Sequence, residues 1–194
     1  MKNNYDVIEI NIDKHDYSED NDYDATGGMI KSQIVCTVVL NGEVVNQTTD
    51  YYAFLYELED PKSLTENIEC PSSYPRDDKA KEDEFGCLIP SATHWIYGIS
   101  RFYPFTCSCG VAGCAGIWNG IKIKHRKYTV EWRAKREDGY TFLPKTYYRF
   151  HRQQYYSQLN KMVAELKEIL ETCQDLEDNT EYLQELLCKL DKKV

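Results

Sequence analysis

The hydrophobic period of the chain changes near residue 150, and this change restricts the fold more than any other feature of the sequence. Beyond it, apolar side chains recur at i, i+3, i+4 and i+7, the spacing of one face of an α-helix. They are Tyr155, Leu159, Met162, Val163, Leu166, Ile169, Leu170 and Cys173. A second such stripe follows Asp178 and Asn179, either of which can cap a helix. Its members are Tyr182, Leu183, Leu186, Leu187 and Leu190. We therefore predict a C-terminal αα-hairpin over residues 150–194, packed on a β-rich domain formed by residues 1–149.

The β-rich part is indicated by short alternating runs that are separated by turn residues. The clearest signal is Asn41-Gly42, a pair that tolerates positive φ at both turn positions, between the apolar runs 33–40 and 43–47. This pattern predicts a β-hairpin. Further strands are predicted at residues 5–12, 94–99, 121–124 and 128–135, with a partner strand starting at 140–142. Helical spacing of apolar residues predicts a short helix over residues 51–59.

The predicted fold class is therefore α+β, with a mainly antiparallel β-sheet or sandwich and a C-terminal αα-hairpin. Residues 60–84 are rich in proline and acidic residues, which predicts a long acidic loop. No apolar run is long enough to span a membrane, and the N-terminus lacks the apolar segment of a signal peptide. We expect a cytoplasmic protein with no membrane partner.

The charge of the chain is unevenly distributed along the sequence. The net charge is −9, yet residues 94–158 hold eleven Lys and Arg residues against three acidic ones. Within this basic centre, Lys122, Lys124 and Arg126 are candidate partner-binding residues, because cations beside aromatic side chains can bind nucleic acid. Strand alternation predicts that Tyr128 and Trp132 face the core, which would prevent them from stacking on bases.

The acidic flanks are the second candidate surface. We predict that a basic partner protein binds to Asp20, Asp22 and Asp24. Long-range attraction between the opposite charges would accelerate the association of the two proteins. The alternation of the three aspartates is similar to the first half of a calcium-binding loop. Ala25 and Lys31 stand where such a loop needs glycine and a bidentate glutamate, so a solvated acidic loop is the favoured interpretation.

The chemically most distinctive segment contains Cys107, Cys109 and Cys114 in a glycine-rich stretch. Three thiolates and a fourth ligand can form a tetrahedral zinc site, and His94 is the first candidate for the fourth position. Cys87 and His125 are the alternatives. A tight loop with buried cysteines, or a reactive thiol beside a histidine base, would use the same residues. The chain is long enough to fold without cross-links, so we expect thiols or metal ligands and no disulfide framework.

The segment Cys-Ser-Cys-Gly-Val-Ala-Gly-Cys-Ala-Gly, followed by the Val-x-Trp strand of Val130 and Trp132, resembles a pattern in uncharacterised bacterial and phage-borne proteins. The resemblance covers residues 105–133. It implies a bacterial or mobile-element source and an intracellular setting, and it implies no activity.

The sequence contains no phosphate-binding glycine loop, nucleophile elbow or zinc-protease motif. Their absence decides neither for nor against an enzyme. Because of the acidic flanks we favour a non-enzymatic binding protein, an inhibitor or regulator that acts on a protein partner through its acidic surface. One alternative is a zinc-supported nucleic-acid-binding module that uses residues 121–136. Another is an enzyme that uses Cys109 or Cys114 with His94 or His125. Association of two copies through the C-terminal helices is a further expectation.

Overall fold

The computed structural model describes residues 5–16, 32–59, 61, 102–107, 115–173, 176 and 180–191. In these residues the chain is an α+β protein with antiparallel ladders and a C-terminal pair of helices, as predicted. The acidic loop over residues 60–84, apart from Pro61, and the strand expected at 94–99 lie outside the described residues.

The first sheet has the order β1-β2-β3. Its strands are β1 (Ile8–Asp16), β2 (Ser32–Leu40) and β3 (Glu43–Val44). The predicted hairpin is confirmed between β2 and β3, and Asn41 and Gly42 take φ values of 54° and 84°. Strand β1 begins at Ile8 and continues past the end of the strand predicted at 5–12, because its pairing with β2 extends to Asp16, which lies opposite Ser32.

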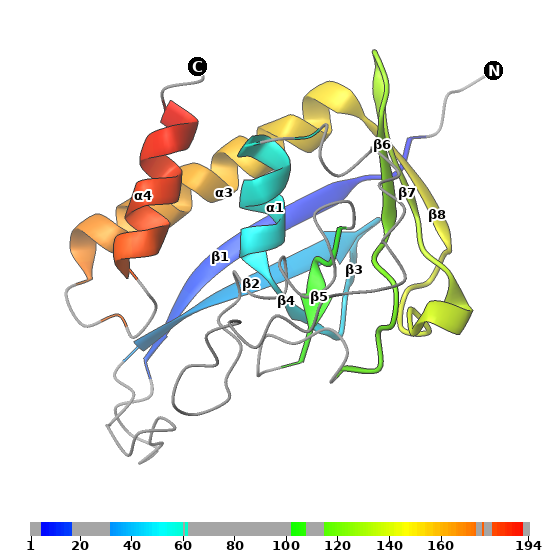
Figure 1. Cartoon of the computed structure of the whole chain (residues 1–194), viewed down its shortest axis with the longest axis horizontal. Coiled ribbons are helices and arrows are strands. Elements are labelled where there is room, and N and C mark those ends of the chain that lie inside the picture. The colour runs from blue at the N-terminus through cyan, green and yellow to red at the C-terminus, as the bar shows by residue number, and fades with distance from the viewer. Residues whose placement is uncertain are drawn as a thin grey trace, which may run out of the picture.

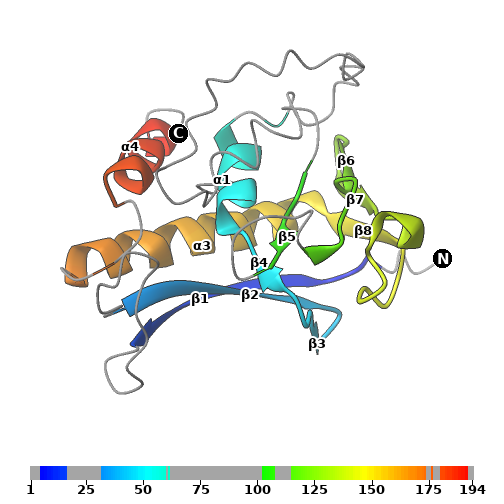
Figure 2. The ribbon, with the colours of Figure 1, turned by 60° about the horizontal axis from the view of Figure 1, so that its bottom comes forward.

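In the described part of the chain the α-helices are α1 (Tyr51–Glu59), α3 (Arg152–Thr172) and α4 (Thr180–Asp191). Helix α3 lies between the β1–β2 ladder and helices α1 and α4 (Figures 1 and 2). Side chains of α3 also bond the edge of β1, because Gln154 donates to the Ile8 carbonyl and Lys161 donates to the Ile10 carbonyl. These contacts fix the position of α3 along the first sheet.

The second three-stranded sheet has the order β6-β7-β8 and carries the candidate functional site. Its strands are β6 (Lys122–His125), β7 (Thr129–Arg133) and β8 (Tyr147–His151). The prediction that the partner strand of β7 starts at residues 140–142 is wrong. A short 3-10 helix, η2 (Arg136–Asp138), follows β7, and the chain forms its next strand only after Pro144. A further short pair joins β4 (Thr48–Thr49) to β5 (Phe105–Thr106).

The core is centred on the fully buried Trp132, which is in the β7 row that faces inward. Its ring centroid lies 5.2 Å from that of Phe102, 5.1 Å from that of Phe150 and 5.9 Å from that of Tyr155. Edge and tilted contacts of this kind are the preferred geometry of aromatic pairs. The second sheet, helix α3 and the segment before β5 are thereby joined in one aromatic cluster.

Gly139 is a position where the fold requires glycine. Its φ is +101°, and an added Cβ would lie 2.2 Å from the Gly116 carbonyl oxygen. We expect Gly139→Ala to destabilise the protein by roughly 2 kcal/mol or more, because strain and a backbone clash act together. Gly42→Ala is the matched control: Gly42 also has positive φ, but a Cβ there meets nothing within 4 Å. Urea unfolding of both variants tests this, and equal losses would contradict it.

Candidate nucleic-acid interface on the second sheet

The strand register places cationic side chains on the outward face of β6, β7 and β8. Lys122, Arg133 and Tyr147 are opposite one another in the first row, and Lys124, Glu131 and Arg149 in the next. The intervening rows face the core, since Ile123, Trp132 and Tyr148 are buried. We call this outward surface the basic face. Its members are Lys122, Lys124, Arg126, Glu131, Arg133, Tyr147 and Arg149, together with Tyr5.

Two arginines of the basic face lie over tyrosine rings. The Arg133 guanidinium is 5.4 Å from the Tyr147 ring centroid, and the Arg149 guanidinium is 5.5 Å from that of Tyr5. Such contacts restrict the arginine side chains while leaving their charge near solvent. Tyr147 is 42% exposed, so part of its ring is open to a ligand.

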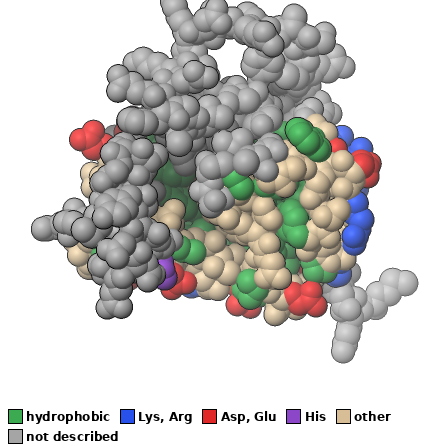
Figure 3. Space-filling view, turned by 90° about the horizontal axis from the view of Figure 1, so that it is seen from below, with side chains coloured by type: hydrophobic (Ala, Val, Ile, Leu, Met, Phe, Trp, Pro, Cys, Tyr) green, Lys and Arg blue, Asp and Glu red, His purple; other side chains and the backbone are tan. Residues whose placement is uncertain are grey.

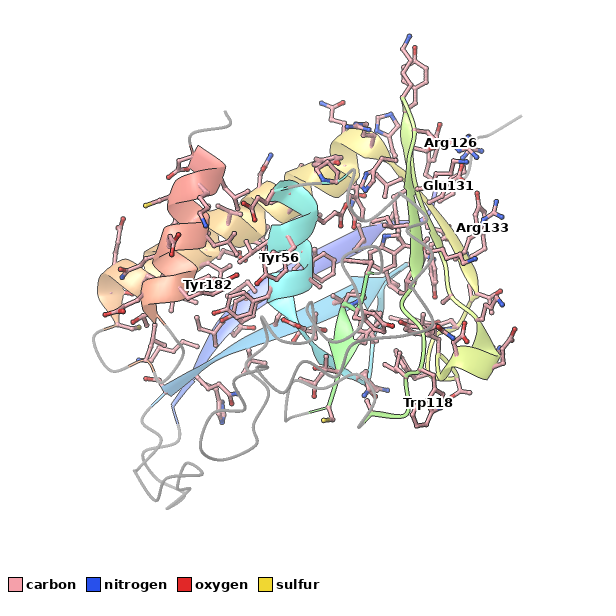
Figure 4. All side chains as sticks on the ribbon, viewed as in Figure 1. Tyr56, Trp118, Arg126, Glu131, Arg133 and Tyr182 are labelled. Carbon is pink, nitrogen blue, oxygen red and sulfur yellow. The ribbon has the colours of Figure 1, made fainter. Side chains whose placement is uncertain are left out.

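The basic face contains one carboxylate, and an arginine neutralises it. Glu131 is 6% exposed, and its Oε1 accepts a 2.6 Å hydrogen bond from Nε of Arg126. Half of the Arg126 side chain stays exposed. Figure 4 shows Arg126, Glu131 and Arg133 together on this side of the molecule. Figure 3, seen from below, shows blue Lys and Arg side chains gathered on the same side.

The structure confirms some of the predictions about the side chains of β6 and β7 and corrects others. Lys122, Lys124 and Arg126 do come together, and Trp132 does face the core. Tyr128 is not in the core: it precedes β7 in the β6–β7 turn and is 63% exposed. Glu131, which alternation placed on the wet face, is buried because Arg126 lies against it.

Sequence reasoning missed Tyr5, Tyr147 and Arg149 as members of the basic face. Strand β8 directly precedes helix α3, and no strand was predicted over residues 147–151. The available signal was the alternation of aromatic Tyr148 and Phe150 with polar Arg149 and His151, which matches the burial pattern of the strand. Tyr5 has no such signal, because it reaches the face only through the tertiary fold.

Behind the basic face lies a buried polar cluster that joins α1, β6 and α3. Glu57 is fully buried, and one of its carboxyl oxygens accepts a 2.6 Å hydrogen bond from the Tyr155 hydroxyl. The other oxygen is 3.5 Å from Nε2 of His125. Nδ1 of the same histidine is 3.1 Å from the Tyr156 hydroxyl.

Burial decides the protonation of this cluster. It raises the pKa of Glu57 to about 8, against the opposing effects of the Tyr155 hydrogen bond and the Arg152 charge. Burial, and then the charge of Arg152, lower the pKa of His125 to about 4. Both shifts favour neutral groups, so near pH 6 the contact is a carboxylic acid beside a neutral imidazole and not an ion pair. Oε1 of Glu57 and Nε2 of His125 face each other at 3.5 Å, and neither atom forms a hydrogen bond with a described residue.

The structure tests only part of the predicted cysteine site. Cys109, Cys114 and His94 lie outside the described residues. Cys107 is partly buried and disulfide-bonded, which corrects the expectation of a thiol or metal ligand at this position. A sulfur in a disulfide has no thiolate to offer a metal. Among the described residues, no three His, Cys, Asp or Glu side chains are grouped so that they could hold a metal ion. Zinc binding by the reduced protein stays a prediction.

Two further surfaces were predicted to bind partners, the acidic flank and the C-terminal helices. Asp20, Asp22 and Asp24 lie outside the described residues, so binding through the acidic flank stays a prediction. The apolar stripes of the C-terminal helices are turned inward: Leu159 and Leu183 are fully buried, and Leu190 is 8% exposed. Val163, Ile169, Leu170 and Tyr182 are only partly buried, and association of two copies through these helices stays a prediction.

None of the described helices has an apolar stretch of the length that crossing a bilayer requires. Comparison of the chain with models of known families, with curated proteins and with solved structures finds no match. The resemblance of residues 105–133 to bacterial and phage-borne proteins therefore stays a prediction.

Proposed function

We propose that this chain is a non-enzymatic binding protein and that its basic face binds single-stranded nucleic acid. The observation that carries the proposal is the strand register, which gathers Lys122, Lys124, Arg133 and Arg149 around two tyrosine rings. Cations that follow a phosphate backbone, next to aromatic rings that stack on bases, are the two components of single-strand binding. An outward sheet face that carries aromatic side chains also suits splayed bases.

The acidic net charge of the chain does not oppose this proposal. Charges separated by more than about 8 Å are largely screened at physiological salt, so local charge decides the contact. The one carboxylate in the rows of the basic face is paired with Arg126. The favoured sequence hypothesis, an inhibitor that acts through an acidic surface, depends on residues outside the described ranges and stays a prediction.

An aromatic substitution distinguishes nucleic acid from an acidic protein partner. We expect Tyr147→Ala to weaken binding of a fluorescent oligothymidylate of about 12 nucleotides by about 5- to 100-fold, because one stacked base contributes about 1–3 kcal/mol. Tyr147→Phe should bind like the wild type, since it keeps the ring. Fluorescence anisotropy measures both affinities.

The control is Trp118→Ala, which removes another exposed aromatic side chain outside the rows of the basic face. We expect it to leave the affinity unchanged. Polyglutamate serves as a model of an acidic protein partner. The proposal would be overturned, in favour of such a partner, if the wild type bound polyglutamate as tightly as the oligonucleotide and Tyr147→Ala changed neither affinity.

A further inference from the structure

The end of the β6–β7 hairpin is held in place by one arginine of α3. The backbone N–H of Arg152 donates to the Tyr128 carbonyl at 2.9 Å, and its Nη1 donates to the Arg126 carbonyl at 3.0 Å. The turn itself is closed by the Arg126 N–H, which donates to the Thr129 carbonyl. The backbone that carries the Arg126 side chain is therefore tied directly to the start of α3.

Arg152 is in turn positioned by the buried cluster. Its guanidinium lies 4.9 Å from the Tyr156 ring centroid, and the Tyr156 hydroxyl is 3.1 Å from Nδ1 of His125. His125 Nε2 faces Glu57, which Tyr155 anchors from the other side. A continuous series of contacts thus runs from the core of α1 to the edge of the basic face.

The Arg126 guanidinium is also held from the protein side, by the buried carboxylate of Glu131. Glu131 binds it through Nε alone, and in the described part of the chain neither terminal NH₂ group of Arg126 forms a hydrogen bond. A guanidinium held in this way presents a fork of donors that matches two phosphate oxygens.

We infer that Glu57, His125 and Tyr156 are positioning residues that hold Arg126 as the phosphate contact of the basic face. The inference rests on the proposed function, because it names the chemical group that this surface receives. It also explains a polar cluster that would otherwise only cost stability, since burying polar groups without complete hydrogen bonding is unfavourable.

A pair of matched tyrosine variants tests the inference. Tyr156→Phe removes the hydroxyl that contacts His125 and keeps the ring beneath Arg152. Tyr56→Phe removes a hydroxyl of similar burial at the contact between α1 and α4, where Tyr56 meets Tyr182 far from the basic face (Figure 4). Both variants lose one partly buried hydrogen bond, so a general loss of stability affects them alike.

We expect Tyr156→Phe to weaken oligothymidylate binding about fivefold, which is the effect of one lost hydrogen bond, and Tyr56→Phe to leave it unchanged. In the free protein, amide exchange measured by NMR should be faster at Arg126 and Arg152 in Tyr156→Phe only. Arg152→Lys, which keeps the charge and loses the planar fork, should reproduce both effects.

The two readouts separate the inference from the proposed function. Suppose that the wild type binds the oligonucleotide, but that Tyr156→Phe has the same affinity and the same amide exchange as Tyr56→Phe. This result would overturn the positioning role and leave the proposed function intact. A wild type that does not bind would overturn the proposed function. The exchange measurement then decides the positioning role by itself, because it needs no ligand: unchanged exchange at Arg126 and Arg152 in Tyr156→Phe would overturn it.

Discussion

Glu57→Gln is expected to gain stability relative to the wild type as the pH rises from 6.5 to 8, by roughly 2 kcal/mol over that range. Glutamine keeps the shape of a neutral glutamic acid and cannot ionise. The wild type must either keep Glu57 protonated or place a carboxylate in a site where burial opposes charge.

The sign follows from the two pKa shifts of the cluster. The pKa of Glu57 is raised from 4.5 to about 8, so between these values the folded state binds one more proton than the unfolded chain, and stability falls as the pH rises. The pKa of His125 is lowered from 6.5 to about 4, so its contribution has the opposite sign and ends near pH 6.5. The two contributions nearly cancel up to pH 6.5, and only the loss due to Glu57 remains above it.

Urea unfolding at several pH values measures this difference, and Glu43→Gln serves as the control because Glu43 is exposed on β3. Other titrating groups occur in both proteins and cancel in the comparison. If the relative stability of Glu57→Gln stays flat or falls over this pH range, then Glu57 is already an anion at pH 6.5, and the neutral cluster described above is wrong.

Reversing two charges of the basic face should have the largest effect on binding. We expect the double variant Lys124→Glu, Arg133→Glu to weaken oligothymidylate binding on the order of 100-fold at low salt, because each position loses a phosphate contact and gains a repulsive charge. Both side chains are exposed, so the fold should tolerate the change. Anisotropy titrations measure the affinity, and circular dichroism checks the fold.

The matched control is Lys167→Glu, Lys189→Glu, which makes the same change in net charge on α3 and α4. These lysines form surface ion pairs with Asp191 and Glu185, at the other end of the molecule from β6, β7 and β8 (Figure 1). A similar loss of affinity in both double variants would show that total charge, and not the basic face, governs binding.

Local sequence signals predicted the elements whose structure is decided locally. Asn41-Gly42 specifies a two-residue turn by its backbone preferences, and the stripe that includes Leu159 and Leu166 specifies a helix and its buried face. Strand β8 escaped prediction because it is short and continues directly into α3.

The candidate site could not be predicted from local sequence patterns, because its residues are brought together by the tertiary fold. Glu57 lies in α1 among apolar residues and reads as a solvent-exposed position, yet it is buried because Tyr155 and His125 meet it from distant parts of the chain. The outward cations of β6 and β7 were visible as a basic stretch. Their grouping with Arg149 depends on the pairing of β7 with β8, which composition does not report.

The most direct test of the central claim is the salt dependence of oligothymidylate binding by the wild type. Three to five phosphate contacts on the basic face predict that the logarithm of the binding constant falls linearly with the logarithm of salt concentration, with a slope of about −2 to −3.5. The Lys124→Glu, Arg133→Glu variant should show a shallower slope. No binding at about 50 mM salt, or a slope near zero, would contradict the assignment of the basic face as a nucleic-acid interface.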